Sequence, residues 1–246
     1  MNLVKFCACE FGIENLEKGQ LYFNSLSNLN DPFEGIFRYR PSTNQDEFER
    51  FYRMYFGDNE KLDYYFQNKH EFYRKINETL EWRYSNNGIC CFSDETCIND
   101  IRMWSHYADK QKGFCLRFNE TLNFSTPREL NEPDKLVGHP SGPFKVEYTD
   151  EYINEDPTAK KLNQRTFLTT KFVDWSHEKE YRFISPIPGP YLFEKQSLIE
   201  VVFGLNFDYT QLATIKATIQ STYPALRFRC QVRVGGRFEL TSIGLD

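Results

Sequence analysis

The chain has 246 residues, of which 17% are aromatic, and its 35 acidic and 30 basic side chains give a formal net charge of -5. The aromatic content argues against a disordered chain, and the mildly acidic balance argues against bulk electrostatic binding to nucleic acid. The first ten residues lack the apolar core of a signal peptide, and no apolar run approaches the length of a membrane span. The seven cysteines are irregularly spaced, so we interpret them as structural thiols and not as metal ligands. Together these features predict a cytoplasmic protein without membrane contact.

Short strands dominate the predicted secondary structure. Alternating side chains and turn residues at the ends predict strands at 2–9, 20–26, 88–93, 114–118, 171–184 and 197–203. Helical spacing appears between them, at 11–18, 101–110, 157–170 and 209–221. Residues 226–240 predict a hairpin around Gly235–Gly236. We therefore predict a single α+β domain over residues 1–246, with mixed, mostly antiparallel sheets around a cleft.

The first polar cluster lies in a predicted turn, where the residues run Asn-Asp-Pro-Phe-Glu over positions 30–34. An aspartate side chain can cap such a turn, and proline fixes its own φ angle. A purely structural turn is therefore one interpretation. In the other interpretation, Asp31 and Glu34 lie at the rim of a cleft and contact a substrate.

Residues 44–85 are unusually rich in both charged and aromatic side chains. Their spacing predicts two helices that are broken near Gly57–Asn59. We interpret this segment as a helical insertion or lid. It can serve as an amphipathic layer packed on a sheet or as the surface that binds a protein partner.

The helix predicted at 101–110 carries Trp104, His106 and Tyr107 close together. Packing in the core would explain the cluster. Alternatively, Trp104 and Tyr107 are aromatic platforms for a substrate, and His106 is a group that titrates near neutral pH. The four histidines of the chain are far apart in sequence, so their spacing predicts no metal site.

The segment 171–184 contains the strongest candidate residues. As a single strand, it places Glu178, Glu180 and Arg182 on one face. That face is either a solvated ion pair, worth little stability, or the wall of a polar cleft with a catalytic carboxylate. Periodicity does not separate the two glutamates, and we take Glu180 as the first choice and Glu178 as the second.

Five blocks of the chain occur in the same order as in a bacterial family. The blocks are ENLEKGQLYFNSLSNLNDPFEG, GICCFSDET, MWSHYADKQKGFCLRFN, DWSHEKEYRFI and IEVVFG. On these blocks the chain resembles domain-of-unknown-function family 2971, which is related to abortive-infection proteins of the AbiGi type. The resemblance implies a role in phage defence or in a toxin-type locus, and it implies no particular reaction.

The segment VKFCACEFGIENLEKGQLYF is also similar to the start of ADP-ribosyltransferases, which have a strand, a short helix and a second strand there. This resemblance implies that NAD is a substrate and that no prosthetic group is bound. It implies that Glu180 or Glu178 holds the nicotinamide ribose and that Tyr107 or Trp104 stacks on nicotinamide. Arg182 or Lys171 would hold the pyrophosphate.

Two functions remain open at this point. One is a defence- or toxin-type enzyme, similar to ADP-ribosyltransferases, that acts on NAD with an unidentified acceptor. The other is a non-enzymatic sensor or antitoxin-like module that binds a nucleotide, a nucleic acid or a protein. In the second function, residues 44–85 would form the partner surface.

Overall fold

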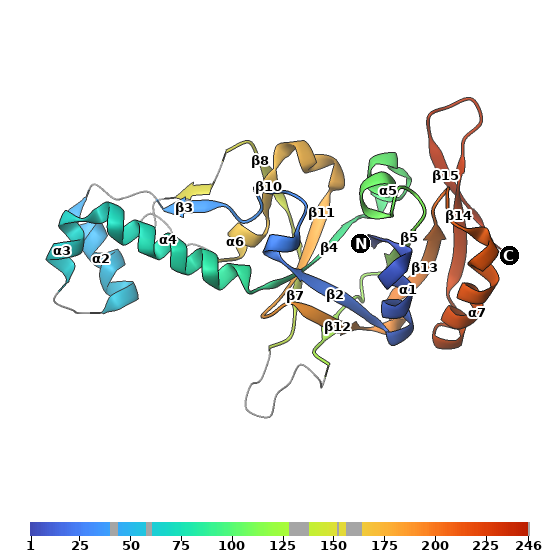
Figure 1. Ribbon diagram of the computed structural model, residues 1–246, viewed down its shortest axis with the longest axis horizontal. Coiled ribbons are helices and arrows are strands. Elements are labelled where there is room, and N and C mark those ends of the chain that lie inside the picture. Colours follow the sequence, from blue (N-terminus) through green and yellow to red (C-terminus); the bar gives the residue numbers. More distant parts are fainter. Residues whose placement is uncertain (40–43, 58–60, 128–137, 152, 156–163, 246) are drawn as a thin grey trace. The chain divides into compact units, whose positions relative to one another are not determined.

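The structure is a computed structural model of the chain, and it describes residues 1–39, 44–57, 61–127, 138–151, 153–155 and 164–245. Contacts divide the chain into two units (Figure 1). The sheet unit comprises Met1–Asn24, Gly88–Lys145 and Ser176–Asp246, and the helical unit comprises Ser25–Asn87 and Val146–Trp175. That the two units form one domain stays a prediction. Among the described residues, no helix combines the length and the apolar character needed to cross a membrane.

The sheet unit is built on one large sheet, which has eleven strands within the described residues. Its order is β15-β14-β13-β5-β1-β4-β2-β12-β6, and β11, which pairs with β4 and β7, lies off this path. The strands are β1 (Leu3–Cys7), β2 (Gln20–Ser25), β4 (Gly88–Asp94), β5 (Phe114–Phe118), β6 (Phe124–Ser125), β7 (Ser141–Lys145), β11 (Glu180–Ser185), β12 (Gly189–Phe193), β13 (Leu198–Phe203), β14 (Arg227–Arg233) and β15 (Leu240–Gly244). β13 and β14 pair in parallel, whereas β1 is antiparallel to both β4 and β5. The predicted α+β class with a mostly antiparallel sheet is confirmed.

The central strands bury both of their faces. In β13, Val201 and Val202 are fully buried but belong to different apolar clusters, and Leu116 and Cys115 of β5 divide in the same way. Successive side chains of a strand point to opposite faces. These strands therefore read as continuous apolar runs because each face of the sheet is covered.

Helices cover the two faces of this sheet. Leu16 of α1 (Cys9–Lys18) and Ile219 of α7 (Leu212–Thr222) join one cluster, and Trp104 of α5 (Ile101–Tyr107) joins the other. Gly19 ends α1 with a left-handed φ of 68°, as its position in the sequence predicts. Helix α5 therefore lies on the opposite face of the sheet from α1 and α7.

The segment predicted as one strand at 171–184 is divided into three elements, so this prediction is wrong in its extent. Strand β10 (Thr170–Phe172) is followed by a 3-10 helix over Val173–Glu178, and β11 begins only at Glu180. Lys179 between them has a φ of 44°. An extended strand cannot pass through that left-handed conformation, so the alternation of faces holds only from Glu180 onward.

The helical unit contains α2 (Gln45–Phe56), α3 (Leu62–Gln67) and α4 (Lys69–Ser85), which are drawn at the left of Figure 1. Gly57 ends α2, as predicted, and the rest of that break lies outside the described residues. A second break at Asn68, where the prediction had one helix, separates α3 from α4. The buried rings of Phe48, Phe51 and Phe72 pack the helices together.

Short elements complete the helical unit. β3 (Phe37–Tyr39) pairs with β9 (Ile153–Glu155), and β8 (Glu147–Thr149) pairs with β10, both in parallel. The helix predicted at 157–170 lies partly outside the described residues, and its described end is α6 (Gln164–Leu168). These elements bring the turn at 31–34 and the residues around 171 into one unit.

Candidate functional site

The charged face of β11 is buried. Arg182 is 0% exposed and Glu180 is 2% exposed. The guanidinium donates from Nε to Glu180 Oε1 at 2.7 Å and from Nη2 to Glu180 Oε2 at 3.0 Å. The prediction that these two side chains share a face is confirmed, and the alternative of a solvated surface pair is wrong. Both carboxylate oxygens of Glu180 are bound by one guanidinium, which is the geometry of a bidentate structural ion pair.

Glu178 has a different environment from Glu180, although the two are close in sequence. It ends the 3-10 helix and is 3% exposed. Its Oε1 accepts a hydrogen bond from the hydroxyl of Tyr107 on α5. The Tyr107 side chain is only half-buried. The structure thus joins a buried carboxylate to an aromatic ring that reaches the surface.

Helix α5 carries three of the predicted site residues in three environments. Asp100 caps its start by accepting from the Arg102 amide at 2.9 Å. Trp104 is fully buried, donates from Nε1 to the Ile98 carbonyl at 2.7 Å and packs its ring edge-on against another aromatic ring of the core. Tyr107 is half-buried and His106 is exposed. Core packing therefore accounts for Trp104, while Tyr107 and His106 keep surface for a ligand.

Helix α5 ends earlier than the predicted Lys110. Its last residue is Tyr107, and Asp109, Lys110 and Gln111 follow with φ angles of 44°, 53° and 71°. Left-handed conformations end an α-helix, and a non-glycine residue adopts them rarely. The early end leaves Tyr107 in the last turn of the helix, where its side chain reaches Glu178.

The 3-10 helix that carries Glu178 contacts a second 3-10 helix, Glu95–Asn99, which precedes α5. The Cys97 thiol lies 3.5 Å from the Glu178 carbonyl oxygen and 3.6 Å from that of His177. Burial raises the pKa of Cys97 to about 11, so the thiol stays protonated and can donate at neutral pH. The interpretation of this cysteine as a structural thiol agrees with these contacts.

The remaining predicted site residues belong to the helical unit. Lys171 Nζ lies 3.4 Å from Glu34 Oε1, and both side chains are at least 97% buried. Lys171 also lies over the ring of Trp175, with its Nζ 5.0 Å from the ring centroid. Asp31 is 3% exposed, and its Oδ1 accepts from the Phe33 amide at 2.9 Å. The predicted turn is therefore both structural and joined to Lys171 through Glu34.

The predicted site residues thus form two groups. The sheet unit holds Trp104, His106, Tyr107, Glu178, Glu180 and Arg182, and the helical unit holds Asp31, Glu34 and Lys171. Within each group the structure brings together side chains that are far apart in sequence. That all of them serve one site stays a prediction.

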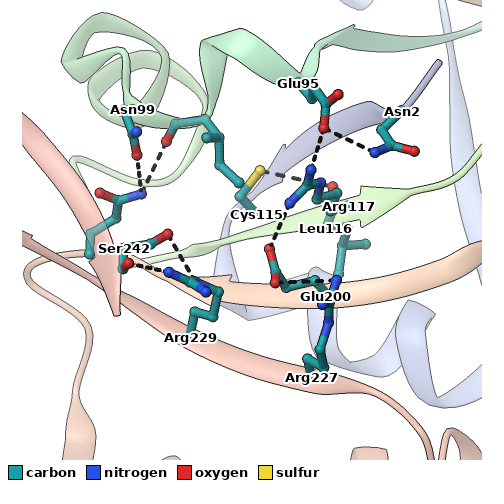
Figure 2. Close-up of polar contacts among 12 residues, drawn as sticks. Asn2, Glu95, Asn99, Cys115, Leu116, Arg117, Glu200, Arg227, Arg229 and Ser242 are labelled. Carbon is teal, nitrogen blue, oxygen red and sulfur yellow. Dashed lines mark hydrogen bonds and ion pairs between the residues drawn. The ribbon is translucent and has the colours of Figure 1, made fainter. Parts of the chain in front are cut away.

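One buried carboxylate was missed by the sequence analysis. Glu200 on β13 is 3% exposed and lies directly opposite Arg117 on β5 and Arg227 on β14. Figure 2 shows the Arg117 guanidinium between the carboxylates of Glu200 and Glu95. The Arg227 guanidinium is 3.7 Å from the other oxygen of Glu200. The sequence feature that could have indicated Glu200 is a single glutamate within the apolar run IEVVF.

Arg229 lies two residues after Arg227 on β14, and therefore on the same face of that strand. Its guanidinium donates to the hydroxyl and the carbonyl oxygen of Ser242 on the neighbouring strand β15 (Figure 2). Arg227 and Arg229 therefore serve cross-strand contacts within the sheet.

The described residues contain no group of three histidine, cysteine, aspartate or glutamate side chains that could hold a metal ion. All seven cysteines are free thiols. The Tyr107–Glu178 pair places a buried carboxylate beside an aromatic ring. Such a pair can accept hydrogen bonds from ligand hydroxyls and stabilise a positive charge next to the ring.

The chain was compared with protein families, curated proteins and solved structures. The model of a family described as a protein of unknown function (DUF2971) matches residues 103–183, about one third of the chain. Searches of the curated proteins and of the solved structures found no match. The matched segment contains Tyr107, Glu178, Glu180 and Arg182, so these side chains lie within the part of the chain that is similar to this family of unknown function.

Proposed function

We propose that the protein is a defence- or toxin-type enzyme, similar to ADP-ribosyltransferases, that cleaves the nicotinamide–ribose bond of NAD. The observation that carries this proposal is the hydrogen bond between Tyr107 and the buried carboxylate of Glu178. The strand–helix–strand order of β1, α1 and β2 also agrees with the start of those enzymes. NAD is the substrate in this proposal, and no prosthetic group is needed.

The reaction would require a negative charge close to the ribose. When the bond between ribose C1′ and the nicotinamide nitrogen breaks, its electron pair leaves with nicotinamide, and the ribose becomes an oxocarbenium-like cation. The acceptor then forms a bond to C1′ and loses a proton. Glu178 would accept a hydrogen bond from a ribose hydroxyl and stabilise this cation, because a charge in a buried site acts through a low dielectric.

Glu178, and not Glu180, is the carboxylate that we assign to this role. Both oxygens of Glu180 are occupied by the Arg182 guanidinium. Glu178 instead contacts Tyr107, whose half-buried ring would stack on nicotinamide. Exposed His106 lies beside that ring, with the two ring centroids 6.1 Å apart, and would contact the same ligand.

Release of nicotinamide from NAD tests the proposal directly. The purified protein would be incubated with NAD, alone and with nucleic acid or cell extract as a source of acceptor, and nicotinamide would be quantified by chromatography. Glu178→Gln keeps the shape and removes the charge, so the rate should fall about 10²–10³-fold. Tyr107→Ala should weaken NAD binding about tenfold or more, because base stacking is worth about 1–3 kcal/mol.

Glu194→Gln is the matched control, since Glu194 is an exposed glutamate of the same unit. It should leave the rate of nicotinamide release unchanged. Wild-type protein that releases no nicotinamide with any acceptor would overturn the enzymatic proposal. Equal rates for wild type and Glu178→Gln, at equal melting temperatures, would remove Glu178 from the site.

A second candidate function is a non-enzymatic module that binds a protein partner. It is favoured by exposed apolar side chains on the helices at 45–85, where Met54 is 65%, Phe56 46%, Tyr64 51% and Trp82 71% exposed. Aromatic residues and methionine are enriched in protein interfaces. If this surface mediates self-association, sedimentation velocity would show concentration-dependent assembly that Trp82→Gln weakens. A monomer at all concentrations would exclude a second copy as the partner.

A further inference from the structure

The helical unit contains a cavity of about 290 Å³ next to the turn at 31–34. Its lining includes three carboxylates, those of Asp31, Glu34 and Glu81. The described residues that line it include no lysine, arginine or histidine. This excess of negative charge distinguishes the cavity from an ordinary packing defect, which is apolar.

Asp31 supplies a second and independent indication of a ligand. Its side chain is 97% buried, and its Oδ1 accepts from the Phe33 amide at 2.9 Å. Its Oδ2 is buried and has no hydrogen-bond partner among the described residues. A buried carboxylate oxygen without a donor is costly to the fold. A hydrogen-bond donor placed in the cavity would remove that cost.

Lys171 pairs with one of the carboxylates that line the cavity. Lys171 lies 3.4 Å from Glu34 Oε1 and is not among the residues that line the cavity. Lys171 therefore offsets the charge of Glu34, and within the described residues no ion pair involves Asp31 or exposed Glu81. The carboxylates of the described lining favour a positively charged occupant.

The apolar residues that line the cavity limit the kind of cation that can bind there. Leu26, Leu29 and Ile36 give the cavity apolar walls, which suit methylene groups and not a hydrated metal ion. Within the described residues, the three carboxylates also do not form a group that could hold a metal ion. An organic cation with a short aliphatic chain combines the required charge, donors and apolar surface.

We propose that this cavity binds an aliphatic ammonium or guanidinium group, with its N–H donating to Asp31 Oδ2. The chain that carries the group packs against Leu26, Leu29 and Ile36. A small polyamine and the side chain of a lysine or arginine residue share this chemistry. The proposal is independent of NAD cleavage, because the Tyr107–Glu178 pair belongs to the sheet unit.

Calorimetric titration of the full chain tests the proposal. The probes are putrescine, agmatine and spermidine as free cations, an acetylated lysine amide as the peptide arm, and 1,4-butanediol as an uncharged analogue of putrescine. At least one cation should bind, and butanediol should not. Asp31→Asn should weaken binding about ten- to a hundredfold, because a hydrogen bond to a charged group is lost.

Two variants serve as controls. Asp63→Asn removes an exposed carboxylate of the same unit and should leave the affinity unchanged, which separates specific binding from general attraction of cations. Asp31→Asn keeps an oxygen that can accept from the Phe33 amide, so the turn should stay folded. Equal affinity of wild type and Asp31→Asn would overturn the proposal, and so would an absence of binding by every cation. Binding by the lysine amide alone would assign the cavity to a peptide.

Discussion

Buried carboxylates have different partners in the two units. In the sheet unit, Glu180 is held by Arg182 and Glu200 is held from two strands by Arg117 and Arg227. In the helical unit, one oxygen of buried Asp31 has no hydrogen-bond partner among the described residues. Burial of a charge alone therefore does not mark a functional site. A buried polar atom without a hydrogen-bond partner is a more specific indication of a functional site.

The architecture explains this difference. In a sheet, the register places residues of neighbouring strands directly opposite each other, so a glutamate can meet an arginine on either side. A turn has no such neighbours, and its polar side chains bond mainly to their own backbone, as Asp31 does to Phe33. The second oxygen of an aspartate in a turn must then find its donor elsewhere.

The largest effect on stability is expected from removing the guanidinium of the buried Arg182–Glu180 ion pair. Arg182→Met leaves Glu180 buried without its guanidinium, so the free energy of unfolding should fall by about 3–5 kcal/mol, measured by urea denaturation. The matched control is Arg237→Met, which breaks an ion pair with Glu239 in which Arg237 is 69% exposed. That control should cost at most about 1 kcal/mol. Similar losses in both variants would mean that the β11 pair is not desolvated as described.

A smaller effect is expected at the Tyr107–Glu178 pair. Tyr107→Phe removes the hydroxyl that donates to a buried carboxylate, and a hydrogen bond to a charged group is worth about 1.5–3 kcal/mol. Tyr209→Phe is the control, because that hydroxyl donates to the neutral carbonyl of Gly204 at 3.2 Å. Its loss should be about 0.5–1.5 kcal/mol. If the two variants unfold at the same urea concentration, Glu178 does not depend on Tyr107.

A substitution of Asp31 is not expected to lower the free energy of unfolding, in contrast to the two substitutions above. Asp31→Asn removes a buried carboxylate whose second oxygen has no hydrogen-bond partner in the described part of the chain, and it keeps an acceptor for the Phe33 amide. Without a ligand, the free energy of unfolding should stay constant or rise by about 1 kcal/mol. Thermal unfolding in amine-free buffer measures this change. A large loss of stability would show that Asp31 is as fully satisfied as Glu180, and the contrast between the units would disappear.

The smallest effect concerns acidic residues at the surface of the sheet unit. The Thr96 hydroxyl and amide donate to Asp94 and lower the pKa of that carboxyl below its ordinary value of 3.8. Because the folded pKa is the lower one, the stabilisation is present above about pH 4 and is lost as the pH falls further. Asp94→Asn should therefore change stability little at pH 7, by about 0.2–1 kcal/mol. Melting temperatures from pH 6 to 3 should fall less steeply for the variant, and parallel curves would contradict the assignment.

Much of the secondary structure followed from local signals. Apolar alternation located β1, β2, β4, β5 and β13, and Gly19 marked the end of α1. Gly57 likewise marked the end of α2. These features are decided by side-chain spacing and by the φ angles that glycine permits, and both can be read from neighbouring residues. The two-residue spacing of Glu180 and Arg182 also correctly predicted that they share a face.

The division of 171–184 could not be predicted in the same way. Lysine does not favour the left-handed φ that Lys179 adopts, so the neighbouring sequence does not predict it. It is held by tertiary contacts, since its ammonium donates to Thr96 and its carbonyl accepts from Asp94. The consequence is functional, because the turn at Lys179 separates the environment of Glu178 from that of Glu180.

The sequence by itself determined the α+β class, most strand positions and the residue types from which a site could be built. The tertiary structure alone decided which charged side chains are buried and which of them have an ion-pair or hydrogen-bond partner. It paired Lys171 with Glu34, 137 positions away in sequence, and Tyr107 with Glu178. Such pairings depend on how distant segments pack, and a period of two or 3.6 residues carries no information about a partner from another element. The same limit applies to Asp31 Oδ2, because only the packed turn shows that this oxygen lacks a hydrogen-bond partner among the residues that the structure describes.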